Sequence, residues 1–126
     1  MAKKIKVLLV EDDSFLRELC AKKLRGEDME VLDTVDGEQA LKVLESEKVD
    51  IILLDIILPT MDGFEVLKKI REHANEEVRK IPVIMLSNLG QEEDIDKAMS
   101  IGANDFLIKA HFTPGEIAQK VKKILE

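Results

Sequence analysis

Apolar and polar positions follow one another in blocks along the chain. Five short apolar runs are each followed by a stretch in which apolar residues return at helical spacing. Short apolar runs with abrupt polar ends are typical of strands buried on both faces of a parallel sheet. The predicted strands lie within residues 5–10, 31–35, 51–59, 83–86 and 106–108. The third run is interrupted by one carboxylate, Asp55, which falls at or near the carboxyl end of its strand.

Helices are predicted after each of these runs. Their buried faces consist of Leu16, Leu19, Cys20 and Leu24; Leu41 and Leu44; Phe64, Leu67, Ile70 and Ala74; Ile95, Ala98 and Met99; and Ile117, Val121, Ile124 and Leu125. A charged segment, residues 75–80, leads to the fourth strand. Because strands and helices alternate, the strands must form a parallel sheet with helices on both faces. The pattern therefore predicts an α/β fold, a three-layer sandwich.

Residues with capping chemistry mark several predicted helix ends. Asp36 stands where an N-cap side chain would accept a backbone hydrogen bond, and Thr113 with Glu116 favours a capping box. Gly26 stands where the first helix would take a left-handed cap, and Gly102 ends the fourth helix. These signals place the helix boundaries.

Length and charge narrow the class of protein. A chain of 126 residues, 45% hydrophobic, is the size of one domain with one proper core, so we expect residues 1–126 to form a single domain. Lys and Arg total 19 against 26 Asp and Glu, a net charge of −7, which disfavours direct binding of nucleic acid. Cys20 is the only cysteine, which excludes an internal disulfide and a thiolate zinc cluster.

The sequence pattern predicts neither a membrane span nor a signal peptide. No apolar segment approaches the length that spans a bilayer, so we expect no membrane insertion. Residues 1–4 precede only six strand-like residues, which is too short for the core of a signal peptide. We therefore expect a cytoplasmic, reducing location.

Five chemically active side chains follow the predicted strands: Glu11, Asp12, Asp55, Ser87 and Lys109. The carboxyl ends of parallel strands lie at one edge of a sheet, where ligands bind in this class of fold. Three carboxylates at one edge repel one another and favour a hard divalent cation such as magnesium. A hydroxyl and an ammonium then remain to hold an anion. This combination suits phosphoryl transfer onto a carboxylate.

The chain closely resembles the receiver domain of two-component response regulators, including the stand-alone chemotaxis-type and phosphorelay receivers. The resemblance spans nearly the whole chain and is carried by residues 7–13, 51–63, 82–87 and 102–109 in this order and spacing. It implies a flavodoxin-like receiver fold with a five-stranded parallel sheet in the order 2-1-3-4-5. It also implies a regulator rather than an enzyme, with at most self-phosphorylation and autodephosphorylation activity.

The resemblance assigns roles to the residues at the strand ends. Asp55 would accept a phosphoryl group from a histidine kinase or a histidine phosphotransfer domain. Asp12, Asp55 and the backbone carbonyl of Ile57 would ligate magnesium, and Glu11 would act through a bound water.

Three further positions would serve the phosphorylated state. Ser87 would hydrogen-bond a phosphoryl oxygen and Lys109 would pair with another. Phe106 occupies the switch-aromatic position, and its ring has no hydroxyl, so its two rotamers would differ by apolar burial alone. The signal would leave through the face of the fourth predicted helix, the fifth strand and the last helix. With no output domain expected within 1–126, it would pass to a downstream protein, unless the chain is part of a longer regulator.

The chain also departs from the family pattern. Ala110 follows Lys109 where proline, with a cis bond, is usual; without proline a cis bond costs about 3–4 kcal/mol, so we predict either a trans link with a rearranged loop or a strained one. Asn88 is larger than usual and would narrow access to the phosphoryl group. Ile57 and Leu89 offer no polar group to orient a water. We therefore hypothesise slow hydrolysis of the phosphoryl-Asp unless a phosphatase acts.

Several competing interpretations remain at this point. The acids could be relics in an interaction module that works without phosphate. A magnesium-dependent phosphohydrolase would need a second acid where Ile57 stands, and no glycine-rich loop for nucleotides is present. Asp13 could be a metal ligand, although an N-cap is favoured.

The remaining polar residues have simpler interpretations. Asp62 is assigned to a turn or helix start, Cys20 to a buried apolar face, and His73 and His111 to solvent. The acidic run of residues 91–96 is interpreted as a solvated helix face.

Overall fold

A five-stranded parallel sheet forms the centre of the molecule. The computed structural model describes residues 4–126, so most of the N-terminal stretch examined for a signal peptide, residues 1–3, lies outside it. The strands are β1 (Lys6–Val10), β2 (Glu30–Thr34), β3 (Ile51–Asp55), β4 (Val83–Ser87) and β5 (Asp105–Ile108). They pair in parallel in the order β2-β1-β3-β4-β5, which confirms the predicted fold class and strand order.

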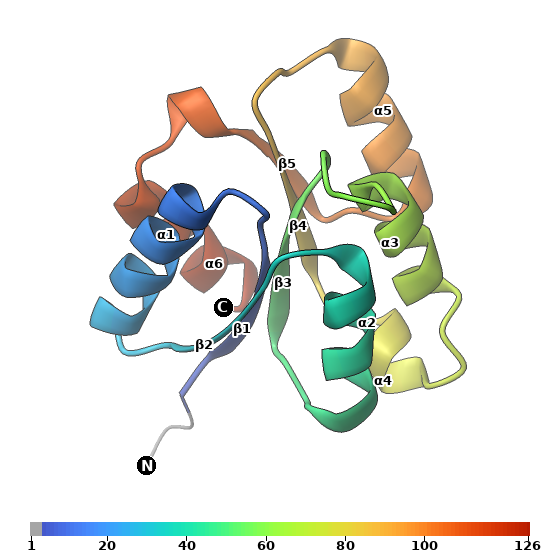
Figure 1. Cartoon of the computed structure of the whole chain (residues 1–126), viewed down its shortest axis with the longest axis horizontal. Helices are drawn as coiled ribbons and strands as arrows, with labels where there is room; N and C mark the ends of the chain where they lie inside the picture. The colour runs from blue at the N-terminus through green and yellow to red at the C-terminus, as the bar shows by residue number, and fades with distance from the viewer. Residues whose placement is uncertain (1–3) are drawn as a thin grey trace.

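Helices cover both faces of this sheet (Figure 1). They are α1 (Ser14–Gly26), α2 (Gly37–Ser46), α3 (Gly63–Arg71), α4 (Glu76–Arg79), α5 (Glu92–Ile101) and α6 (Pro114–Ile124), with a 3-10 turn at Lys109–His111. The first and last helices pack on one face, and the other four pack on the opposite face. The predicted three-layer sandwich is therefore confirmed.

The sheet separates two hydrophobic cores. Along β1, Leu8 and Val10 face the core under α2, α3 and α5, whereas Val7 and Leu9 face the core under α1 and α6. Every residue of β3 is buried, because successive side chains point to opposite faces and both faces are covered. This is why the central strands read as continuous apolar runs rather than as an alternating pattern.

Most predicted caps are present. Asp13, Asp36 and Asp62 each accept a backbone hydrogen bond at the start of a helix, and Thr113 completes a capping box with Glu116. Asp13 is thus the N-cap that we favoured over a metal ligand. The positive φ of 124° at Gly102, just after α5, agrees with its predicted role.

The prediction for Gly26 was wrong. Gly26 is the last residue of α1, and the left-handed residue is Asp28, with φ 66°. The helix is closed at Glu27, whose N–H bonds the carbonyls of Lys23 and Leu24. Aspartate tolerates this conformation better than most residues, so glycine is not required there.

The charged segment after α3 also differs from the prediction. The predicted third helix ends at Arg71, three residues before Ala74, and four residues of the supposed connection form α4. Asn75 caps this turn through a bond from the N–H of Glu77, and Val78 is its buried residue. A single turn contains too few apolar positions to show a helical period.

Arg71 joins the segments around this turn. Its guanidinium donates to the carbonyls of Gly102 (2.9 Å), Arg79 (2.9 Å) and Ile81 (2.7 Å) and to Oδ1 of Asn104 (3.0 Å). Burial lowers the pKa of Arg71. The side chain therefore donates at once to carbonyls at the end of α4, just after α5 and just before β4.

Some side chains lie differently from their predicted faces. Leu19 and Met99, expected on buried faces, are exposed. His73, expected to be solvated, is mostly covered: Nε2 lies 2.9 Å from Oε1 of Glu45 and Nδ1 accepts from the N–H of Asn75. His111 is exposed and Cys20 is buried, as predicted. Within residues 4–126, no helix has the length and apolarity to cross a membrane.

Candidate functional site

The polar residues predicted at the strand ends meet at one edge of the sheet. The register places Val10 beside Leu54, Asp55 beside Leu86, and Ser87 beside Ile108. The residues that end these strands, or follow them, therefore lie side by side at the carboxyl edge. These are Glu11, Asp12, Asp55, Ser87 and Lys109.

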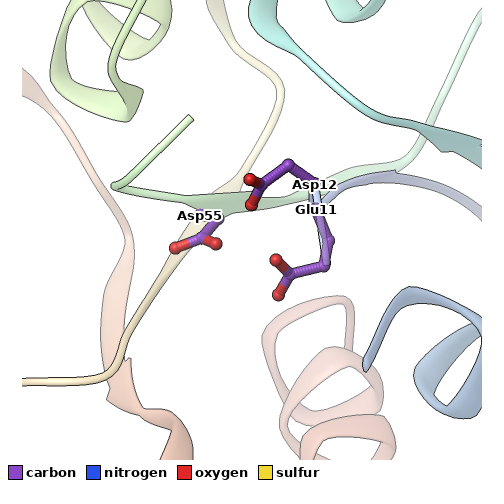
Figure 2. A group of neighbouring side chains, drawn as sticks. All are labelled: Glu11, Asp12 and Asp55. Atoms are coloured by element: carbon purple, nitrogen blue, oxygen red, sulfur yellow. The ribbon is translucent and has the colours of Figure 1, made fainter. Parts of the chain in front are cut away.

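Three carboxylates form the centre of the site. Glu11 and Asp12 project from the loop after β1, and Asp55 faces them from the end of β3 (Figure 2). Each residue contributes one carboxylate oxygen to a group of three oxygens that all lie within 4.8 Å of one another. Glu11 and Asp55 are buried, whereas Asp12 is open to solvent. An oxygen-only set with one exposed member fits magnesium, which retains water ligands.

Lys109 places an ammonium among these acids. Its Nζ donates to Oε1 of Glu11 at 2.5 Å and to Oδ2 of Asp55 at 2.9 Å. Burial lowers the pKa of Lys109, but the bonds to Glu11 and Asp55 outweigh this effect and the net shift is upward. Burial raises the pKa of Glu11, Asp55 adds to the rise, and Lys109 offsets part of it. Lys109 therefore remains charged at neutral pH.

Lys109 reaches this position without the usual proline. The bond from Lys109 to Ala110 is trans, and residues 109–111 form a 3-10 turn. Of the two outcomes predicted for this loop, the structure contains the trans one.

The loop after β3 depends on a glycine that the sequence analysis did not single out. Gly63 donates to the carbonyl of Ile56 at 2.7 Å. A Cβ on Gly63 would lie 2.3 Å from the carbonyl oxygen of Asp55, which is far inside contact distance. Thr60 in the same loop has φ 64°, a strained value for a β-branched residue. In the sequence, the only indication of this tight contact is that a glycine follows the N-cap residue Asp62.

The mouth of the site has a hydroxyl and two apolar side chains. Oγ of Ser87 accepts from the N–H of Leu89 at 3.2 Å. Ile57 and Leu89 are 68% and 65% exposed. Phe106 is partly buried against the core under α2, α3 and α5. Positions 57 and 89 therefore offer no polar side chain that could orient a water molecule at the mouth of the site.

Arg17 also contacts the acidic loop, and the sequence analysis missed it. From α1, Nη1 donates to the carbonyl of Glu11 at 3.0 Å. The helical pattern marked Arg17 only as a polar position between Leu16 and Leu19, so spacing gave no indication of this contact.

Comparison with known proteins identifies the family. The model of the response regulator receiver domain matches residues 7–122. The alkaline phosphatase synthesis transcriptional regulatory protein PhoP of Bacillus subtilis is 37% identical over 120 residues, which cover 95% of this chain and 48% of that protein. The transcriptional regulatory protein SrrA of Staphylococcus aureus is 34% identical over 119 residues, 94% of this chain and 47% of that protein. The chain thus spans about half the length of these curated relatives.

Solved structures agree with this result. The chemotaxis response regulator CheY4 of Vibrio cholerae superposes with a TM-score of 0.89 at 28% identity, covering 98% of this chain and all of that one. The receiver domain of the sensor histidine kinase PA1611 of Pseudomonas aeruginosa, whose structure has a magnesium ion in its active-site cleft, gives 0.86 at 30% identity and covers 98% of both chains. The resemblance found in the sequence is confirmed, and the chain belongs to the response regulator receiver domain family.

Proposed function

We propose that this receiver domain is a switch that is turned on when Asp55 accepts a phosphoryl group from a phosphohistidine. The donor would be a histidine kinase or a histidine phosphotransfer protein. The observation that carries the proposal is the ion pair between Lys109 Nζ and Asp55 Oδ2, 2.9 Å long, beside two further acids. The cluster would supply a carboxylate nucleophile, a fixed cationic donor and a cation site together.

The chemistry is a displacement at phosphorus. A carboxylate oxygen of Asp55 attacks, an O–P bond forms, and the P–N bond to the donor imidazole breaks with its electron pair leaving on nitrogen. The new acyl phosphate carries more negative charge than the carboxylate it replaces. Lys109 would pair with one phosphoryl oxygen, and the hydroxyl of Ser87, which accepts a hydrogen bond from the N–H of Leu89, would donate a hydrogen bond to another.

Magnesium would be held by Asp12, Asp55 and the backbone carbonyl of Ile57, with Glu11 acting through a water. When bound, it would neutralise charge on the transferring phosphoryl group. The fit rests on the three carboxylates within 4.8 Å and on the exposure of Asp12. Glu11 accepts hydrogen bonds from Lys109 and from the N–H of Asp13.

The output would be a changed surface. In the labels of Figure 1, the face proposed from the sequence corresponds to α5, β5 and α6, because the short α4 precedes it. Phe106 lies on β5, so movement of Ser87 and inward rotation of Phe106 would alter this face for a downstream protein.

Labelling with acetyl phosphate and magnesium tests the proposal. Intact-mass spectrometry should show a phosphoprotein in the wild type and none in Asp55→Asn. Asp96→Asn is the matched control, since Asp96 is an exposed acid on α5, away from the cluster. Absence of labelling with acetyl phosphate and with phosphohistidine donors would favour an interaction module that works without phosphate.

A further inference from the structure

We propose that Arg17 is a positioning residue that holds the acidic loop in the shape required for cation binding. This inference rests on the proposed function and goes beyond the family's phosphoacceptor, metal ligands and switch residues. Its basis is the position of Arg17 on the carbonyl side of the loop that carries Glu11 and Asp12.

The acidic loop must point its side chains in different directions. Glu11 turns inward to Lys109, and Asp13 turns back to cap α1 through the N–H of Leu16. Asp12 is exposed, its carboxylate lies within 4.8 Å of the other two acids, and within residues 4–126 that carboxylate has no hydrogen bond that would fix its direction. The orientation of Asp12 therefore depends on the loop backbone.

Arg17 binds two successive backbone carbonyls of that loop, those of Glu11 and Asp12. Nη1 donates to the carbonyl of Glu11 at 3.0 Å and approaches the carbonyl of Asp12 at 3.4 Å. Only 15% of the Arg17 side chain is exposed. A guanidinium holds its donors in a rigid plane, so fixing the group also fixes these carbonyls.

The guanidinium is itself anchored at the edge of the sheet. Nε lies 3.5 Å from Oδ2 of Asp33 on β2. Arg25, also on α1, lies 3.4 Å from the other oxygen of Asp33, but it donates to the carbonyl of Val31 and not to the acidic loop. Arg25 therefore provides a matched control with the same helix, charge and anchor.

The sign of the effect separates positioning from simple electrostatics. If Arg17 acted only through its charge, removing it would strengthen magnesium binding, because like charges repel. If Arg17 positions the loop, removing it weakens binding. Arg17→Lys keeps the charge but loses the planar group, so it should also weaken binding.

Magnesium affinity can be followed by amide chemical shifts of the labelled protein at constant ionic strength. Arg17→Gln and Arg17→Lys should bind magnesium more weakly by about fivefold or more, and Arg25→Gln should stay within about twofold of the wild type. Initial rates of labelling by acetyl phosphate should need correspondingly more magnesium, with the plateau rate at saturating magnesium retained.

Unchanged or tighter binding in Arg17→Gln would overturn the inference, and so would an equal loss in Arg25→Gln. If circular dichroism shows that Arg17→Gln is unfolded, Arg17→Lys decides alone, since it keeps the charge and loses only the planar group. Weaker magnesium binding in a folded Arg17→Lys, with Arg25→Gln normal, supports the inference, and unchanged binding overturns it. Failure of the wild type itself to bind magnesium or to be labelled would instead count against the proposed function.

Discussion

At the scale of single residues, strain is concentrated in the loop beside Asp55. Thr60 adopts φ 64°, which disfavours a β-branched side chain, whereas asparagine tolerates it. Thr60→Asn should therefore raise the free energy of unfolding by about 0.5–1 kcal/mol. Urea denaturation followed by circular dichroism would measure this. Thr60→Ala, which keeps the unfavourable backbone, should give no comparable gain, and an equal gain would contradict the explanation.

Cys20 shows how burial controls reactivity. Burial, and to a smaller extent the charge of Glu11, raises the pKa of its thiol to about 11. At pH 8.5 roughly 1 in 300 folded molecules would carry the thiolate, against about half of unfolded ones. Iodoacetamide should thus modify the native protein at least a hundredfold more slowly than the protein in urea; similar rates would refute this.

The same shift has a consequence for stability. The folded state keeps the thiol proton that the unfolded state loses, so Cys20 should make stability fall as pH rises from about 8.5 toward 11. Cys20→Ala should reduce that slope, as measured by thermal melts across this pH range.

At the scale of elements, the hydrogen bonds of Arg71 connect several segments, so their loss should lower the stability of the fold. Arg71→Leu leaves the carbonyls of Arg79, Ile81 and Gly102 without their donor, so the free energy of unfolding should fall by about 2–4 kcal/mol. Urea titration would measure the loss. Lys69→Leu, on an exposed position of the same helix, should change little, and an equal effect would argue against the hydrogen-bond explanation.

The elements also show what sequence could and could not predict. The strands and main helices were predictable because periodicity is a local property, and parallel pairing then brings Asp55, Glu11 and Lys109 to one edge. The turn α4 was not, because four residues show no period. No local sequence pattern indicates the contacts of Arg71, of Arg17 or of the His73–Glu45 pair. These contacts join residues that are distant in sequence or lie in different elements.

At the scale of the whole molecule, the acidic cluster should link folding to cation concentration. A cation that binds only the folded state stabilises it by mass action. Millimolar magnesium should therefore raise the melting temperature, beyond sodium chloride at equal ionic strength. In Asp12→Asn this rise should be lost, while melting without magnesium should move upward, because one of three repelling carboxylates is removed. Unchanged melting with magnesium would count against the cation site.

The two hydrophobic cores on opposite faces of the sheet have no buried side chain in common. Leu24 belongs to the core under α1 and α6, and Leu67 belongs to the core on the other face. Sites that share no contacts give additive changes in stability. One face can therefore accumulate substitutions, for a new partner for instance, without altering the tolerance of the other. The receiver is in this sense two separately adjustable halves joined by one sheet.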